Sequence, residues 1–135
     1  MRRVGFEVRA LGKTLRQKRN RVTLFEEMGL PKGLVAQLTA AGIHEPTPIQ
    51  SHAIPHALNG KDVLGLAQTG TGKTFAFGAP LVTQLSEMTG RSDSKMVRGL
   101  ILAPTRELAK QISDSIKLLV VNSPIKIGLV VGCVS

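Results

Sequence analysis

The chain has 135 residues, of which 42% are hydrophobic and 20% are charged, and its formal net charge is +9. This length and composition are typical of one globular domain, and no apolar run reaches the roughly 18 residues of a membrane-spanning helix. Cys133 is the single cysteine, which excludes an internal disulfide and predicts a reducing compartment, the cytoplasm.

The positive charge is concentrated at the N-terminus. Residues 1–21 carry eight basic side chains and one acidic side chain, whereas the other 114 residues have a net charge of only +2. We therefore expect a flexible basic arm over residues 1–22, which would attract polyanions such as RNA through counterion release. A transit peptide and a solvated leader without function are the alternatives. Since the only aromatic residues are four phenylalanines, any bound nucleic acid is expected to be held by its backbone rather than by base stacking.

Two helices are predicted before residue 60. The first lies within residues 30–42, where leucines recur at helical spacing between a proline and a glycine. The second covers residues 48–58, because Thr47 is a natural N-cap and Pro48 suits the first helical position. The apolar face of this second helix consists of Ile49, Ala53, Ile54, Ala57 and Leu58.

Three short apolar segments, residues 63–66, 99–103 and 125–131, are predicted to be strands that alternate with helices. The first has no polar alternation, which is typical of a strand buried on both faces of a parallel sheet. The order predicts right-handed β-α-β units, and hence an α/β fold with helices on both faces of a parallel sheet. Because such sheets usually have about five or six strands, we expect a fold truncated after about three, whose last strand exposes an apolar edge that favours association.

Two further helices are predicted between these strands. The helix after Lys73 contains Pro80, which should remove one backbone hydrogen bond and kink it. Its apolar side is predicted to be Phe77, Leu81, Leu85 and Met88. The last helix begins after Pro104-Thr105 and has an apolar face of Leu108, Ile112, Ile116 and Leu119.

A glycine-rich loop follows the first predicted strand and opens a helix. Gly70 and Gly72 let the backbone turn so that N–H groups point at phosphate oxygens, next to the positive end of the helix dipole. Lys73 would reach the β- and γ-phosphates of a nucleotide, and the Thr74 hydroxyl would coordinate Mg²⁺. The alternative is a flexible loop with a solvated lysine. The segment is Ala67, Gln68, Thr69, Gly70, Thr71, Gly72, Lys73 and Thr74, with Ala67 where the strict motif has glycine.

Gln50 has two competing interpretations. Its side-chain amide offers an acceptor and a donor side by side, which complements the N6/N7 edge of adenine and would distinguish ATP from GTP. It also stands three residues after Thr47, which is the spacing of a capping box.

The start of the last helix carries an unexpected cation. Thr105 caps the helix and Glu107 suits its positive end, whereas Arg106 lies in the first turn, where the helix dipole disfavours it. A helix N-terminus with an arginine suits a nucleic-acid phosphate. The alternative is a surface arginine paired with Glu107.

Four segments in this order and spacing, namely Phe25, residues 42–50, 67–74 and 104–108, resemble the DEAD-box RNA helicases over roughly residues 23–135. The resemblance implies a RecA-like P-loop NTPase fold, with an adenine-recognition (Q motif) segment over residues 23–51 and a partial ATP-binding domain over 54–135. It also implies that Phe25 and Gln50 form the adenine site of a protein that uses ATP and Mg²⁺, with Lys73 and Thr74 catalytic; ordinary core packing is the alternative for Phe25. The residues implied to contact the RNA sugar-phosphate backbone, independently of sequence, are Pro104, Thr105, Arg106, Glu107 and Gly132.

The chain departs from the family in two respects. Cys133 follows Gly132 where the family usually repeats glycine, and no Asp-Glu-Ala-Asp or Ser-Ala-Thr segment occurs. We therefore expect the N-terminal piece of a helicase that couples RNA-stimulated ATP hydrolysis to local duplex unwinding, and expect the isolated chain to be inactive. A non-catalytic remnant that binds adenine nucleotide or RNA is the alternative, and an unrelated ATPase that shares only the phosphate loop is a more distant one.

Overall fold

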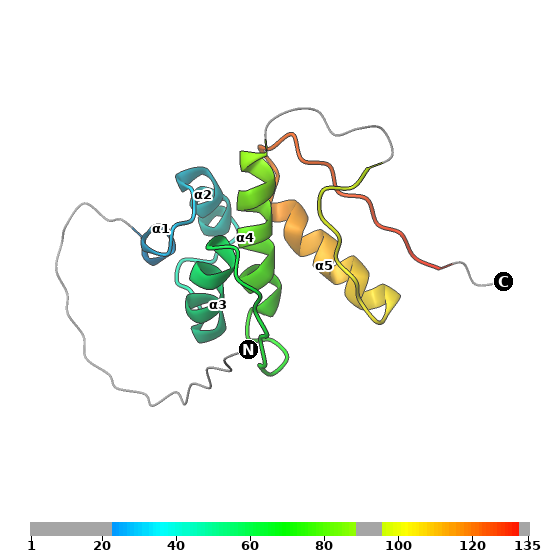
Figure 1. The fold of residues 1–135 in the computed structure, drawn as a ribbon, viewed down its shortest axis with the longest axis horizontal. Helices are drawn as coiled ribbons and strands as arrows, with labels where there is room; N and C mark the ends of the chain where they lie inside the picture. The colour runs from blue at the N-terminus through cyan, green and yellow to red at the C-terminus, as the bar shows by residue number, and fades with distance from the viewer. Residues whose placement is uncertain (1–22, 89–95, 133–135) are drawn as a thin grey trace.

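The computed structural model describes residues 23–88 and 96–132, so the basic arm and Cys133 lie outside the described residues. Within these ranges the chain forms five helices, and none of them is long and apolar enough to cross a membrane. Helices α1, α2 and α3 lie on one side of α4, and α5 lies on its other side (Figure 1). The helices are α1 (Leu24–Glu27), α2 (Lys32–Ala40), α3 (Pro48–Leu58), α4 (Lys73–Glu87) and α5 (Arg106–Leu119).

The helix boundaries follow the capping residues, and the predicted helices are confirmed. Thr105 accepts a hydrogen bond from the Leu108 N–H at 3.2 Å and so caps α5. At the other ends of α2 and α3, Gly42 and Gly60 have φ angles of +79° and +69°, a left-handed conformation that glycine adopts without a steric penalty. These local signals place each helix along the chain before any tertiary contact is considered.

The hydrophobic core lies where α4 packs between its neighbours. Leu38 of α2, Ile54 of α3 and Ala79 of α4 are completely buried. Helices α4 and α5 approach closely at Gly78, where an added Cβ would lie 3.3 Å from Cγ1 of Ile116. The absence of a side chain at Gly78 therefore lets Ile116 pack directly against the backbone of α4.

Helix α4 continues through Pro80 as expected, but only Leu81 and Leu85 of its predicted apolar side are partly buried. Phe77 and Met88 are 40% and 50% exposed. The buried residues are instead mostly small: Ala76, Gly78, Ala79, Pro80, Val82 and Thr83. The reason is that α4 packs between α3 and α5, and small side chains on both flanks allow these helices to approach closely. The larger Leu81 and Leu85 instead face the extended segment near Gly99, where an added Cβ would lie 3.3 Å from each of them.

The strand predictions are not reproduced, since the structure assigns no strand within residues 23–88 and 96–132. The three apolar segments run as irregular chain beside the helices (Figure 1). Many of their side chains are exposed, with Leu64 at 86%, Leu102 at 84% and Val130 at 94%, whereas Ala103, Ile125 and Ile127 are partly buried against the core. The predicted burial of residues 63–66 on both faces is therefore not observed. A strand needs a neighbour that pairs with its N–H and C=O groups, and these segments do not pair with one another.

The exposed apolar segments predict self-association. Substituting Val130, which is 94% exposed, with lysine should weaken association about tenfold to a hundredfold, since burying a valine side chain contributes about 1.5–3 kcal/mol and lysine protects exposed edges. Sedimentation velocity over a range of protein concentrations measures this. Leu118→Lys, at a 45% exposed position on α5, is the control and should leave association unchanged; an equal effect of both substitutions would contradict the prediction.

Candidate nucleotide-binding site

The glycine-rich loop connects the exposed segment at residues 63–66 to the start of α4. Gly70 and Gly72 have φ angles of +81° and +85°, in the left-handed region that favours glycine. Gly72 is the N-cap of α4, and Lys73 is its first residue. The expected turn at these glycines and the helix N-terminus behind the loop are therefore confirmed.

Lys73 closes the loop on itself. Its Nζ donates a hydrogen bond to the carbonyl oxygen of Ala67, at the opposite end of the loop. Within the loop, the Thr71 hydroxyl donates to the Gln68 carbonyl at 2.7 Å. The ammonium group thus lies over the loop at the N-terminus of a helix, and the helix dipole and the lysine together favour a bound anion at this place. Thr74 follows as the second residue of α4 and is half-buried.

Gln50 joins this loop to α3. It is 2% exposed, its Oε1 accepts a hydrogen bond from the Thr47 N–H at 3.0 Å, and its Nε2 donates to the Gly72 carbonyl at 3.0 Å. The Gln50 half of the capping box is therefore confirmed, whereas Oγ1 of Thr47 is buried and has no hydrogen-bond partner among the described residues. The bond to Gly72 was not predicted, because partners 22 positions apart in the sequence give no local signal. One hydrogen of Nε2 and one lone pair of Oε1 remain, so adenine recognition by this amide stays a prediction.

Gly72 is constrained by Gln50 as well as by its own backbone angle. A Cβ built at Gly72 would lie 2.4 Å from Nε2 of Gln50 and 3.2 Å from Oγ1 of Thr47. A larger residue would therefore have to displace the amide that holds the loop. At Gly70 a Cβ would have no neighbour within 4 Å, so only the backbone angle requires glycine there.

Phe25 lies in the core. Its ring is 1% exposed and belongs to the same hydrophobic cluster as Leu30 and Leu34. Core packing, the alternative interpretation, describes this structure. Stacking on adenine requires an uncovered ring face and stays a prediction.

The residues predicted to contact RNA lie on the surface. Pro104, Thr105, Arg106 and Glu107 are all exposed at the start of α5, and Gly132 is exposed as well. Among the described residues, no ion pair joins Arg106 to Glu107, so the paired surface arginine is not observed. The Arg106 guanidinium is thus available to a phosphate, and RNA contact stays a prediction.

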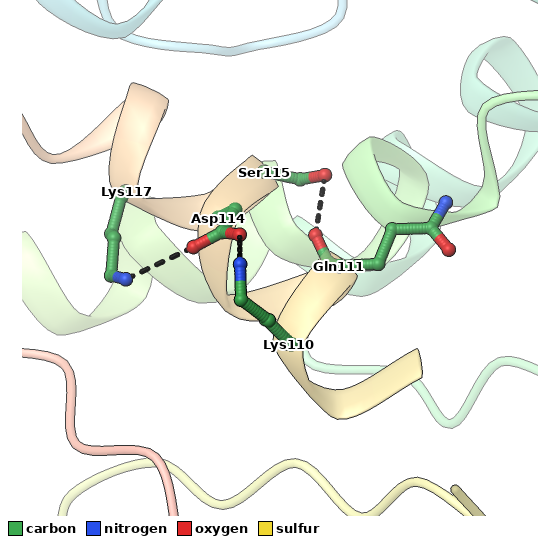
Figure 2. A network of polar contacts seen from close by, with 5 residues as sticks. All are labelled: Lys110, Gln111, Asp114, Ser115 and Lys117. Atoms are coloured by element: carbon green, nitrogen blue, oxygen red, sulfur yellow. Dashed lines mark hydrogen bonds and ion pairs between the residues drawn. The ribbon is translucent and has the colours of Figure 1, made fainter. Parts of the chain in front are cut away.

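Two lysines on the exposed face of α5 share one carboxylate. Asp114 lies 3.0 Å from Lys110 and 3.0 Å from Lys117, while the Ser115 hydroxyl donates to the Gln111 carbonyl beside them (Figure 2). The hydrogen bond from Lys117, followed by that from Lys110, lowers the pKa of Asp114 below its usual value of 3.8. The carboxylate offsets part of the positive charge that this face would present to a polyanion.

The turned glycine loop, its lysine and the helix behind it are the arrangement of a P-loop protein. A family model described as DEAD/DEAH box helicase matches residues 47–135. The chain therefore belongs to the DEAD/DEAH box helicase family.

Curated relatives and solved structures agree with this assignment. The chain is 46% identical over 95 residues to the DEAD-box ATP-dependent RNA helicase CshA of Bacillus cereus, and 47% identical over 108 residues to the ATP-dependent RNA helicase DBP8 of Debaryomyces hansenii. These matches cover 70% and 80% of this chain, but only 17% and 23% of the relatives.

The structural neighbours are RecA-like DEAD-box helicase domains. The RNA helicase Prp28 of Chaetomium thermophilum, bound to ADP, aligns with 92% of this chain and 30% of its own at a TM-score of 0.74 and 39% identity. The Dbp5 protein of S. cerevisiae, bound to RNA and ADP BeF3, aligns with 70% of this chain and 24% of its own at a TM-score of 0.53 and 29% identity.

A double-mutant cycle tests the contact between Gly72 and Gln50. Gly72→Ala should cost about 1–2 kcal/mol for the left-handed backbone and more for displacing the Gln50 amide. In a Gln50→Ala background only the backbone cost should remain, which gives a coupling free energy of about 0.5–3 kcal/mol in urea unfolding. Gly70→Ala is the control, because its cost should not depend on Gln50. Additive effects at Gly72 would show that Gln50 does not constrain this position.

The pKa of Asp114 should lie below 3.8 in an NMR titration of its carboxyl carbon and rise toward 3.8 in the double variant Lys110→Gln/Lys117→Gln. Because the folded-state pKa is lowered, the interaction stabilises the protein above about pH 3.8 and this contribution disappears as the pH falls through the folded-state pKa. The shift should also shrink in about 1 M salt, where charges are screened within about 3 Å. A pKa that is the same in the wild type and the double variant would refute the assigned cause.

Proposed function

We propose that this chain forms part of an ATP-dependent RNA helicase, in which RNA-stimulated ATP hydrolysis is coupled to local unwinding of an RNA duplex. The observation that carries the proposal is the hydrogen bond from Gln50 to the Gly72 carbonyl. It places Gln50, whose amide can recognise adenine, against the glycine loop, whose N–H groups can bind phosphate. A single bound nucleotide needs both groups close together. The names of the relatives, which are ATP-dependent RNA helicases, support the same function.

The proposed nucleotide is ATP with Mg²⁺. The free hydrogen of Gln50 Nε2 and the free lone pair of its Oε1 suit N7 and N6 of adenine. The N–H groups of residues 68–74 would hold the phosphates, Lys73 would donate to a phosphate oxygen, and the Thr74 hydroxyl would be a ligand of Mg²⁺. Bound Mg²⁺ would neutralise charge on the phosphates. The family's ADP-bound neighbours support this assignment.

The proposed partner is the sugar-phosphate backbone of RNA, bound independently of sequence. The exposed Arg106 lies in the first turn of α5, where it adds a cation to the free N–H groups of a helix N-terminus. We also propose that residues 63–66, 99–103 and 125–131 become strands of one parallel sheet when further strands pair with them. The same proposal places the protein in the cytoplasm, because its single cysteine suits a reducing compartment.

A second candidate is a non-catalytic protein that binds adenine nucleotide or RNA. The two candidates share the binding site and differ only in turnover.

Calorimetric titration of the 135-residue chain with Mg²⁺ and either ATP or GTP tests the shared site. Lys73→Ala should weaken ATP binding at least about tenfold, because it removes a charge-assisted contact to phosphate. Gln50→Ala should reduce the preference for ATP over GTP about fivefold to a hundredfold, since a bidentate base contact contributes about 1–3 kcal/mol of discrimination. Lys61→Ala, at an exposed lysine outside the loop, is the control.

Turnover separates the two candidates. In a longer protein that contains this chain, RNA should stimulate ATP hydrolysis, and Lys73→Ala should abolish it. Unchanged hydrolysis in the Lys73 variant would refute the helicase proposal. Nucleotide binding without any RNA-stimulated hydrolysis would favour the second candidate.

A further inference from the structure

The exposed side of α3 carries two histidines. His52 and His56 are four positions apart and both exposed, whereas Gln50, Ala53 and Ile54 form the buried side of the helix. Residues at this spacing lie one above the other on successive turns, with Cβ atoms about 5–6 Å apart. Both imidazole rings therefore project into solvent from the same strip of the helix surface.

The His52 ring is fixed in one tautomer by the backbone. Its Nδ1 lies 2.7 Å from the Pro48 carbonyl oxygen. A carbonyl only accepts, so Nδ1 carries the proton and donates, which leaves the lone pair of Nε2 free in the neutral ring. Metal-binding histidines have this arrangement, because a hydrogen bond from the second nitrogen to a carbonyl fixes the ring and raises the basicity of the ligating nitrogen.

The histidines also span the weak turn of α3. Pro55 lies inside the helix and has no N–H, so the Ser51 carbonyl lacks its usual partner. The turn that loses this hydrogen bond lies between His52 and His56. A bridge between the two rings would hold together the same turn that the proline weakens.

We propose that His52 and His56 form a binding site for a divalent transition-metal ion on the outer face of α3. The Nε2 atom of His52 and one ring nitrogen of His56 would be the protein ligands, with water completing the coordination. Imidazole ligands favour Cu²⁺, Ni²⁺ and Zn²⁺ over Mg²⁺ and Ca²⁺, which prefer oxygen ligands. The part of the chain that the structure describes has no group of three or more potential ligand residues, so the site has two protein ligands and open positions.

Occupation of this site would stabilise α3. A metal that binds the folded helix and not the separated histidines raises the stability by mass action. The same helix holds Gln50, whose amide is bonded to the Gly72 carbonyl. The proposed site is distinct from the nucleotide site, since Thr74 and the phosphate loop are not among its ligands.

Titration of the untagged 135-residue chain with NiCl₂ at pH 7.5 tests the site, with thermal unfolding in the presence and absence of Ni²⁺ as a second measurement. The wild type should bind one Ni²⁺ and melt at a higher temperature with it. His52→Gln and His56→Gln should each weaken binding at least about tenfold and abolish the rise in melting temperature. Both side chains are exposed, so circular dichroism should show both variants folded.

Two control variants make the outcome specific. His44→Gln removes an exposed histidine outside α3 and should bind Ni²⁺ as the wild type does. The exchange His56→Asn/Asn59→His keeps the number of histidines at three but separates the pair by seven positions, about 10 Å along the helix axis, and should lose binding. Unchanged affinity in either single α3 variant or in the exchange variant, or loss in the His44 variant, would overturn the proposal.

Discussion

The hydrogen bond from Gln50 to the Gly72 carbonyl is the interaction on which the candidate site depends. It connects parts of the chain 22 residues apart and is made by an amide that is 2% exposed. The opposite end of the same amide accepts from the Thr47 N–H and so fixes the start of α3. One side chain therefore positions a helix N-terminus and a phosphate loop relative to each other. The arrangement tolerates only glycine at position 72, because any Cβ there would lie against the amide nitrogen.

The helices were predictable because their signals are local. Thr105 caps α5, Pro48 begins α3, and glycines with positive φ follow α2 and α3. The strands were not reproduced because strand pairing is a property of neighbours and not of a segment. Residues such as Leu64 and Val130 have the apolar character of a buried strand, yet no backbone within residues 23–88 and 96–132 forms a strand beside them. The buried face of α4 was not predicted for a related reason. Helical periodicity identifies large apolar residues and overlooks a packing surface made of small residues such as Gly78 and Ala79.

At the candidate site, the backbone angles of the loop were predicted correctly, whereas the contacts between side chains and the loop were predicted only in part. The requirement for positive φ at Gly70 and Gly72 follows from the motif alone. For Gln50 the sequence offered capping and base recognition as competing roles, and the structure shows that capping uses only part of its hydrogen-bonding capacity. Phe25 could not be placed from sequence, because an aromatic residue beside an apolar helix can either contact a ligand or pack in the core. In the structure its ring is 1% exposed and lies in the core.

The hydrogen bond from Lys73 to the Ala67 carbonyl sets the conditions for binding any anion that recruits this lysine. The ammonium group has three N–H donors and this bond uses one of them, so two remain for a ligand. The bond also holds a long side chain that would otherwise rotate freely, and ordering a lysine costs up to about 2 kcal/mol of rotamer entropy. Because folding already orders Lys73, an anion that reaches the loop finds the positive charge preorganised at the N-terminus of α4.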